Sequence, residues 1–220
     1  MKQFLGRLYL RAAGWKHTGP LPDIDKCVVI AAPHTSNWDG AHMVAITWAL
    51  GLKMNWMAKH TLFKPPLGWL IKRLGAVPID RRAPHGLVAQ MAQLFDERDR
   101  LWLAVPPEGT RSKVDFWKSG FYAIAYEAKV PVLLGFLDFE NKIGGVGPAV
   151  EITGDPRADM DKIRDFYAGM KGARPELQGP IRLRAEQDNV WPPGATADES
   201  AEPADDGDRA LVDPETKAAS

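Results

Sequence analysis

The polar turn at residues 33–40 carries a histidine and an aspartate at a spacing that suits proton transfer. His34 precedes Asp39 by five positions, and the intervening Ser36 and Asn37 both favour a helix N-cap. Inside one regular helix, five positions turn two side chains about 140° apart, so the pair would not meet. If His34 precedes the helix and Asp39 lies in its first turn, Asp39 can hold one ring nitrogen and leave the other to accept a proton. We therefore expect a carboxylate-oriented base here; a cap-rich loop with an incidental histidine is the alternative.

A second polar turn, Glu108-Gly109-Thr110-Arg111, combines groups that suit an anion. Gly109 allows close approach of the backbone, Thr110 offers a hydroxyl, and Arg111 offers a planar fork of donors that fits phosphate. For the tetrapeptide alone, a tight turn with a surface ion pair is the competing interpretation.

Both turns come directly after short apolar runs that are typical of buried strands, at residues 27–31 and 101–105. An apolar segment of helical length, residues 42–50, follows the first turn. The turns therefore lie where α/β proteins commonly bind their ligands, at the ends of strands.

The rest of the chain continues the alternation of strands and helices. Further strands are expected at residues 54–58, 75–79, 130–136 and 148–153, and further helices at 84–98, 119–128 and 159–170. This alternation predicts an α/β sheet protein.

The spacing His-x4-Asp resembles the first motif of the glycerolipid acyltransferase family, whose members acylate lysophosphatidic acid and related lysolipids. Three later segments match the family in order: residues 75–81, 107–112 and, more weakly, 130–132. The resemblance covers about residues 28–135. It implies a mixed β-sheet flanked by helices.

The resemblance also implies roles for individual residues. His34 corresponds to the general base and Asp39 to the acid that orients it. The residues that match the substrate- and phosphate-binding positions are Lys59, Arg81, Glu108, Gly109, Thr110 and Arg111. Neither a metal ion nor a bound cofactor is expected; acyl-CoA or acyl-carrier protein would serve as co-substrate.

The implied reaction moves a fatty acyl group to a lysophospholipid, most simply 1-acylglycerol 3-phosphate. Three alternatives remain open: an acyltransferase that acts on another lyso-lipid, such as a lyso-ornithine lipid; a non-catalytic lipid-binding relative; and a hydrolase. The missing Gly-x-Ser-x-Gly elbow disfavours a hydrolase, and the intact motifs disfavour an inactive relative. Departures from the family pattern, such as Pro33 before the histidine and Pro106-Pro107 before the second turn, bear on lipid specificity.

Composition separates a basic body from an acidic end. Residues 185–220 hold ten acids and two bases, which leaves 26 bases and 18 acids in residues 1–184. A basic body suits anionic lipids, phosphorylated substrates or coenzyme A, and no nucleic-acid motif is present. We expect an acyltransferase domain over residues 1–187 and a disordered acidic tail over 188–220.

Two basic and aromatic stretches have the profile of a membrane surface element. Large apolar side chains are mixed with bases in residues 2–16 and again in residues 61–74. The first stretch lies within an amphipathic, interfacial helix that we expect at residues 1–18. For residues 2–16, packing on the protein's own core is an equal alternative. No signal peptide and no run of about 18 apolar residues occurs. We therefore expect a cytoplasmic protein that lies peripherally on the inner face of the membrane.

Overall fold

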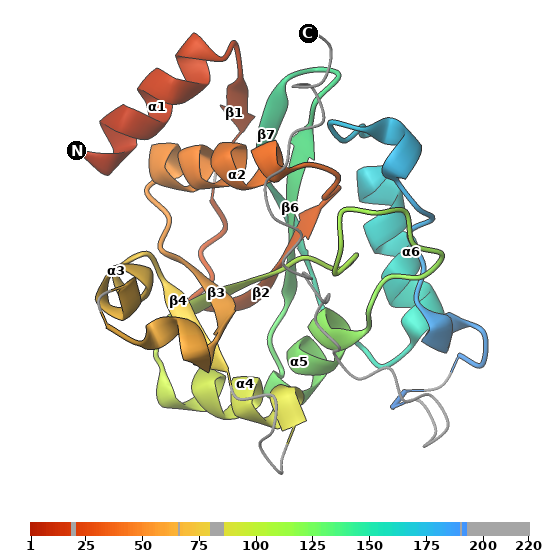
Figure 1. Cartoon of the computed structure of the whole chain (residues 1–220). Coiled ribbons are helices and arrows are strands. Elements are labelled where there is room, and N and C mark those ends of the chain that lie inside the picture. The colour runs from red at the N-terminus through yellow and green to blue at the C-terminus, as the bar shows by residue number, and fades with distance from the viewer. Residues whose placement is uncertain (19–20, 66, 80–85, 190, 193–220) are drawn as a thin grey trace, which may run out of the picture.

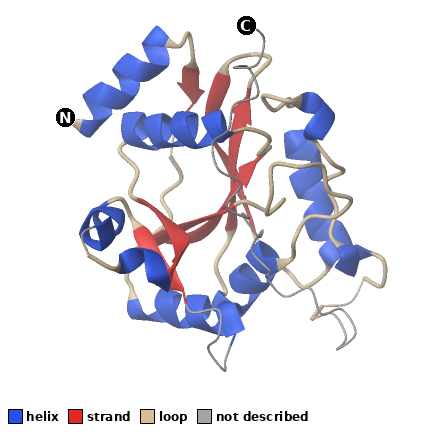
Figure 2. Cartoon of the chain, viewed as in Figure 1, coloured by secondary structure: helices blue, strands red, loops and turns tan. Residues whose placement is uncertain are grey.

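The computed structural model describes residues 1–18, 21–65, 67–79, 86–189 and 191–192, with only the backbone of Lys59 and Leu67. Across these residues, seven strands form one mixed sheet in the order β1-β7-β6-β2-β5-β3-β4, with helices on both faces (Figures 1 and 2). The predicted α/β fold with a mixed sheet is confirmed.

The strands are β1 (Lys16–Thr18), β2 (Lys26–Ala32), β3 (Met54–Lys59), β4 (Ala76–Ile79), β5 (Leu101–Val105), β6 (Val132–Asp138) and β7 (Ile143–Val150). The α-helices are α1 (Lys2–Ala12), α2 (Asn37–Leu50), α3 (Leu67–Arg73), α4 (Gly86–Glu97), α5 (Gly120–Ala128) and α6 (Pro156–Tyr167). Short 3-10 turns lie at η1 (His60–Phe63), η2 (Pro175–Leu177) and η3 (Arg184–Glu186).

The sheet brings the predicted motifs to one edge. β2 is parallel to both β5 and β6, β5 is parallel to β3, and β3 is parallel to β4. The carboxyl ends of these strands therefore lie at the same edge. The register pairs Ile30 with Val105, so the turns that follow β2 and β5 are direct neighbours.

The central strands are apolar on both faces because both faces are covered. Val28 and Ile30 of β2 belong to the main core with α4, α5 and α6, while Cys27 and Val29 point to the opposite side. On that opposite side, α1 and α2 pack through a cluster that includes Leu10, Trp15, Ile46 and Leu137 (Figure 1). The side chains of these four β2 residues are fully buried. Burial on both faces explains why the sequence of β2 is a continuous apolar run and does not alternate between apolar and polar residues.

Several element boundaries differ from the sequence-based expectation. The strand expected at 148–153 is β7, Ile143–Val150, which pairs antiparallel with β6 through a glycine-rich stretch. Residues 16–18 form β1, at the end of the stretch expected as the N-terminal helix. The α2 helix begins at Asn37, so it contains the apolar segment 42–50 and has Asp39 in its first turn, as expected.

The end of the described chain lies against the body. Trp191 packs against Tyr122 with the ring centroids 4.6 Å apart. Apart from residues 188–189 and 191–192, the acidic tail expected at 188–220 lies outside the described residues.

The two basic and aromatic stretches each bury one side and expose the other. α1 buries Gly6 and Leu10 against the body but leaves Phe4 68% exposed, and α3 leaves Trp69 70% exposed. The α1 helix therefore packs on the core through one side and presents apolar side chains to solvent on the other, and its interfacial role stays a prediction. None of the helices in the described part of the chain is long and apolar enough to span a bilayer.

Candidate active site

The turn after β2 brings His34 and Asp39 together. Nδ1 of His34 lies 3.2 Å from Oδ2 of Asp39. The His34 side chain is 30% exposed and the Asp39 side chain 2% exposed, so the carboxylate is shielded while the imidazole can be reached from solvent. With its Nδ1 proton directed at Asp39, the neutral ring presents Nε2 as a base.

Helix α2 holds the aspartate in place through a capping box. Ser36 is the N-cap, and its hydroxyl accepts the backbone N–H of Trp38. Oδ2 of Asp39 in turn accepts the backbone N–H groups of Thr35 at 2.7 Å and Ser36 at 2.8 Å. The same capping that starts the helix therefore fixes the carboxylate beside the imidazole.

The other Asp39 oxygen has unused capacity. Oδ1 is buried and has no hydrogen-bond partner among the described residues. The negative charge of the Asp39 carboxylate favours the positive charge that forms on the neighbouring His34 ring when the ring takes up a proton.

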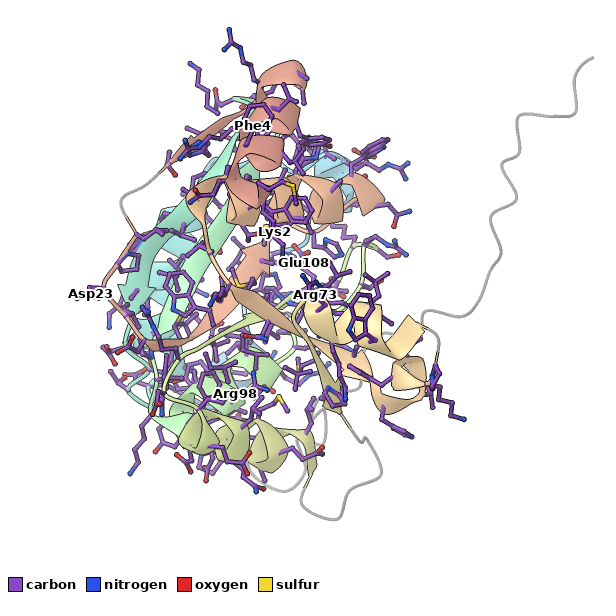
Figure 3. The ribbon with its side chains drawn as sticks, turned by 90° about the vertical axis from the view of Figure 1, so that its left-hand side faces the viewer. Lys2, Phe4, Asp23, Arg73, Arg98 and Glu108 are labelled. Atoms are coloured by element: carbon purple, nitrogen blue, oxygen red, sulfur yellow. The ribbon has the colours of Figure 1, made fainter. Side chains whose placement is uncertain are left out.

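Glu108, from the turn after β5, contacts the same histidine from its other side. Its Oε2 accepts the backbone N–H of His34 at 2.7 Å, although the two residues are 74 positions apart. Glu108 is 6% exposed and lies inside the molecule (Figure 3). Through this contact the Glu108 carboxylate holds the first motif, and the substrate-binding role expected for Glu108 stays a prediction.

Burial changes the acid strength of Glu108. The pKa of its carboxyl is raised from 4.5 to about 7, mainly because burial disfavours the charged form; the hydrogen bond and the charge of His34 lower this pKa, and the negative charge of Asp39 raises it. A cavity of about 40 Å³ beside Glu108 is lined by Pro33, Trp117 and Tyr167, among others. Burial and the nearby Glu108 charge raise the pKa of the Tyr167 hydroxyl as well, and this hydroxyl donates to the Gly135 carbonyl at 2.8 Å.

The rest of the second turn faces outward. Gly109 has φ 67°, a left-handed conformation that favours glycine. The hydroxyl of Thr110 accepts the backbone N–H of Ser112, and Arg111 is exposed. An exposed arginine three residues after Glu108 can meet an anion that approaches the imidazole from solvent.

The structure is less informative about two expected cations. Lys59 is the last residue of β3, at the same sheet edge as the two turns, but its side chain lies outside the described part. Arg81 follows β4 and also lies outside the described residues. Their substrate-binding roles stay predictions.

The remaining described histidines have other surroundings. His42 is 7% exposed; its Nδ1 lies 2.8 Å from the Trp38 carbonyl oxygen, and its ring packs on Trp15. His42 is therefore a packed core histidine. His17 lies in β1 and His60 begins η1. Tyr167 was missed as a neighbour of the site, because no local pattern links α6 to a turn some 60 residues earlier.

The sequence of the chain is similar to those of known acyltransferases. The Acyltransferase family model matches residues 16–133. The 1-acyl-sn-glycerol-3-phosphate acyltransferase of Streptococcus pneumoniae is 32% identical over 191 residues, which span 81% of this chain and 68% of that protein. The protein of the same name from Pseudomonas aeruginosa is 28% identical over 179 residues, spanning 73% of this chain and 68% of that one.

A solved structure shares the fold. The crystal structure of the 1-acyl-sn-glycerophosphate (LPA) acyltransferase PlsC from Thermotoga maritima matches with a TM-score of 0.53 and 18% sequence identity. The match covers 78% of this chain and 80% of that chain.

Proposed function

This chain belongs to the Acyltransferase family, and we propose that it transfers a fatty acyl group from acyl-CoA or acyl-carrier protein to a lysophospholipid, most simply 1-acylglycerol 3-phosphate. The observation that carries the proposal is the oriented, solvent-accessible imidazole of His34, beside a turn that ends in the exposed Arg111. The names of the two bacterial relatives support the same acceptor.

The dyad accounts for the proton that the reaction must move. Nε2 of His34 takes the proton of the acceptor hydroxyl as the hydroxyl oxygen attacks the thioester carbonyl. The C–S bond then breaks, an ester forms, and the proton passes from His34 to the departing thiolate. Asp39 stabilises the imidazolium between these steps. General-base assistance of this kind contributes about 10²–10⁴-fold in rate.

Arg111 is suited to the phosphate of the acceptor. Its planar guanidinium can form two parallel hydrogen bonds to phosphate oxygens. The turn that carries it is fixed against the first motif by the Glu108–His34 contact. A phosphate bound by Arg111 would therefore be held by the same turn that contacts the first motif.

Exposed apolar side chains support a peripheral position on the cytoplasmic face of the membrane. Phe4 and Leu8 of α1 and Trp69 of α3 are each more than half exposed. Bases stand beside aromatic rings in the same elements, with Arg73 5.7 Å from the centre of the Trp69 ring (Figure 3). This combination binds anionic interfaces, because aromatic rings enter the headgroup boundary while the bases attract the lipid charge.

The test is a product assay across acceptors and donors. The purified protein is supplied with 1-acylglycerol 3-phosphate, unphosphorylated monoacylglycerol or a lyso-ornithine lipid, each with acyl-CoA or acyl-carrier protein, and products are identified by mass spectrometry. We expect phosphatidic acid as the main product. Faster acylation of the lyso-ornithine lipid would identify the other acceptor class. Release of free fatty acid without ester would indicate a hydrolase, and binding without any turnover would indicate a non-catalytic relative.

A further inference from the structure

A segment beyond the family match lies directly on the first motif. Residues 170–181, here called the strap, follow α6 and lie outside residues 16–133. The backbone N–H of Arg174 donates to Oγ1 of Thr35 at 3.1 Å. Thr35 is the residue after His34, and it is 2% exposed.

The strap approaches Thr35 as closely as the backbone allows. A Cβ added to Gly172 would lie 2.7 Å from Oγ1 and 3.1 Å from Cγ2 of Thr35, and 3.3 Å from Cγ of Pro33. Gln178 closes the strap on itself, since it accepts the Gly172 N–H at 3.0 Å and donates to the Met170 carbonyl at 3.2 Å. Because Thr35 is β-branched and stiff at χ1, it has little room to turn away.

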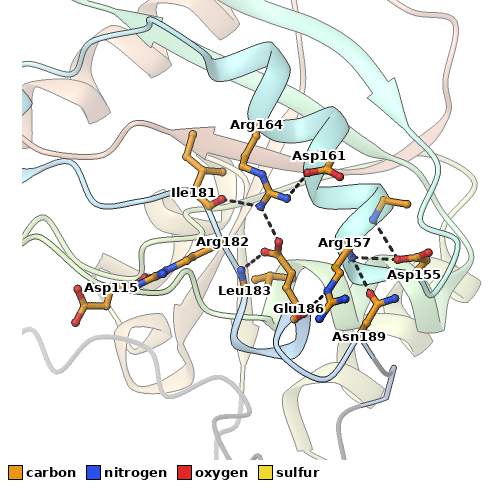
Figure 4. Close-up of polar contacts among 11 residues, drawn as sticks. Asp115, Asp155, Arg157, Asp161, Arg164, Ile181, Arg182, Leu183, Glu186 and Asn189 are labelled. Atoms are coloured by element: carbon orange, nitrogen blue, oxygen red, sulfur yellow. Dashed lines mark hydrogen bonds and ion pairs between the residues drawn. The ribbon is translucent and has the colours of Figure 1, made fainter.

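Both ends of the strap are anchored. The Phe139 N–H donates to the Lys171 carbonyl at 2.8 Å, and Arg164 of α6 donates to the Ile181 carbonyl at 3.0 Å. Arg164 also pairs with Glu186, and Arg157 donates to the carbonyls of Glu186 and Gln187 (Figure 4). The segment after the strap is thus clamped to α6, and the strap meets Thr35 from a fixed position.

Thr35 connects the strap to the dyad. Its backbone N–H donates to Oδ2 of Asp39 at 2.7 Å, and this same oxygen lies 3.2 Å from Nδ1 of His34. A displacement of Thr35 would therefore move a hydrogen bond on the atom that orients the imidazole.

We propose that the strap is a positioning element of the active site, which holds the His34–Asp39 pair in its productive geometry through the Thr35 hydroxyl. This inference rests on the proposed function. Thr35 acts through Asp39 and is a positioning residue, so its loss should affect turnover more than acceptor binding.

The experiment compares Thr35→Val, which keeps the shape but removes the hydroxyl, with Thr35→Ser, which keeps the hydroxyl. Thr47→Val is the matched control, since the Thr47 hydroxyl donates to the Val44 carbonyl within α2. We expect Thr35→Val to lower kcat roughly 10- to 100-fold, the scale of a small misplacement of a catalytic group, with KM for the acceptor within about twofold. Thr35→Ser and Thr47→Val should stay near the wild type.

A second readout does not depend on activity. Hydrogen exchange at the amides of residues 35 and 36, which donate to Asp39, should accelerate in Thr35→Val and stay protected in Thr35→Ser. Gly172→Ala adds one methyl group against Thr35 and should lower kcat and amide protection as Thr35→Val does. It replaces Thr35→Val in both measurements if that variant does not fold. Unchanged kcat or unchanged protection in Thr35→Val, or equal defects in the serine and valine variants, would overturn the proposal. A wild type that fails to transfer acyl groups would instead refute the proposed function, while the exchange measurement would still test the strap.

Discussion

Replacing Glu108 by glutamine should make the protein more resistant to unfolding as the pH rises. The variant keeps an oxygen that can accept the His34 N–H, but it removes the ionisable group. Burial raises the pKa of the Glu108 carboxyl from 4.5 to about 7. The pKa of this carboxyl is higher in the folded protein than in the unfolded protein. The carboxyl therefore contributes its full stabilisation when the pH is below its pKa in the unfolded protein, and this stabilisation is lost as the pH rises through its pKa in the folded protein.

The size of the effect follows from this shift. A shift from 4.5 to about 7 corresponds to about 3 kcal/mol, at about 1.4 kcal/mol for each pH unit. Glu108 is 6% exposed, so solvent screens the effect little. Between pH 5 and pH 8, the wild type should lose roughly 2–3 kcal/mol of unfolding free energy relative to Glu108→Gln.

Urea unfolding at pH 5 and pH 8, followed by tryptophan fluorescence, measures this difference. Glu127→Gln, at an exposed position of α5, controls for the loss of a surface carboxylate and should run parallel to the wild type. If the unfolding free energy of Glu108→Gln changes between pH 5 and pH 8 as much as that of the wild type, the Glu108 carboxyl is not shielded from water and the reasoning fails. The expected result would mean that the site keeps a carboxylate that costs stability at neutral pH, as functional sites often do.

Three further predictions concern the dyad, the phosphate and the membrane. Asp39→Asn should cut kcat severely, because an amide can present its N–H to the imidazole and favour the wrong tautomer. Circular dichroism should show that the variant is still folded, and near-normal turnover would contradict the orienting role of Asp39. Arg111→Ala should raise KM for a phosphorylated acceptor by roughly 10- to 150-fold, the equivalent of about 1.5–3 kcal/mol for a charge-assisted hydrogen bond; Arg81→Ala should act in the same direction, and equal treatment of phosphorylated and unphosphorylated acceptors would refute both. The protein should cosediment with anionic vesicles but not with neutral ones. The bound fraction should fall at high salt and after removal of residues 1–16, and it should not fall after removal of residues 188–220. Absence of binding to anionic vesicles would show that α1 and α3 serve another purpose.

Local patterns were sufficient for most of the fold. Apolar runs such as residues 101–105 have the length and composition of buried strands, and β5 has these bounds. The His34–Asp39 contact was also predictable, because only a helix that starts between the two residues lets them meet. Ser36 provides that start.

Other features depend on partners that no local pattern reveals. β7 contains Gly144, Gly145 and Gly147, which weaken any periodic signal; it is stabilised by pairing with β6. The contact from Glu108 to the His34 backbone joins two strand ends that only the sheet order makes neighbours. The contact between Arg174 and Thr35 spans 139 positions, so the strap could not be assigned to the site from sequence.

The rate of acyl transfer by His34→Ala tests the central claim most directly. The wild type and the variant are compared at saturating acyl donor with 1-acylglycerol 3-phosphate, and unfolding in urea is measured for both to show that the variant is folded. We predict a fall in kcat of about 10²–10⁴-fold, the contribution of a general base, with little change in KM. A folded His34→Ala protein that turns over within a few-fold of the wild type would contradict the assignment of His34 as the base.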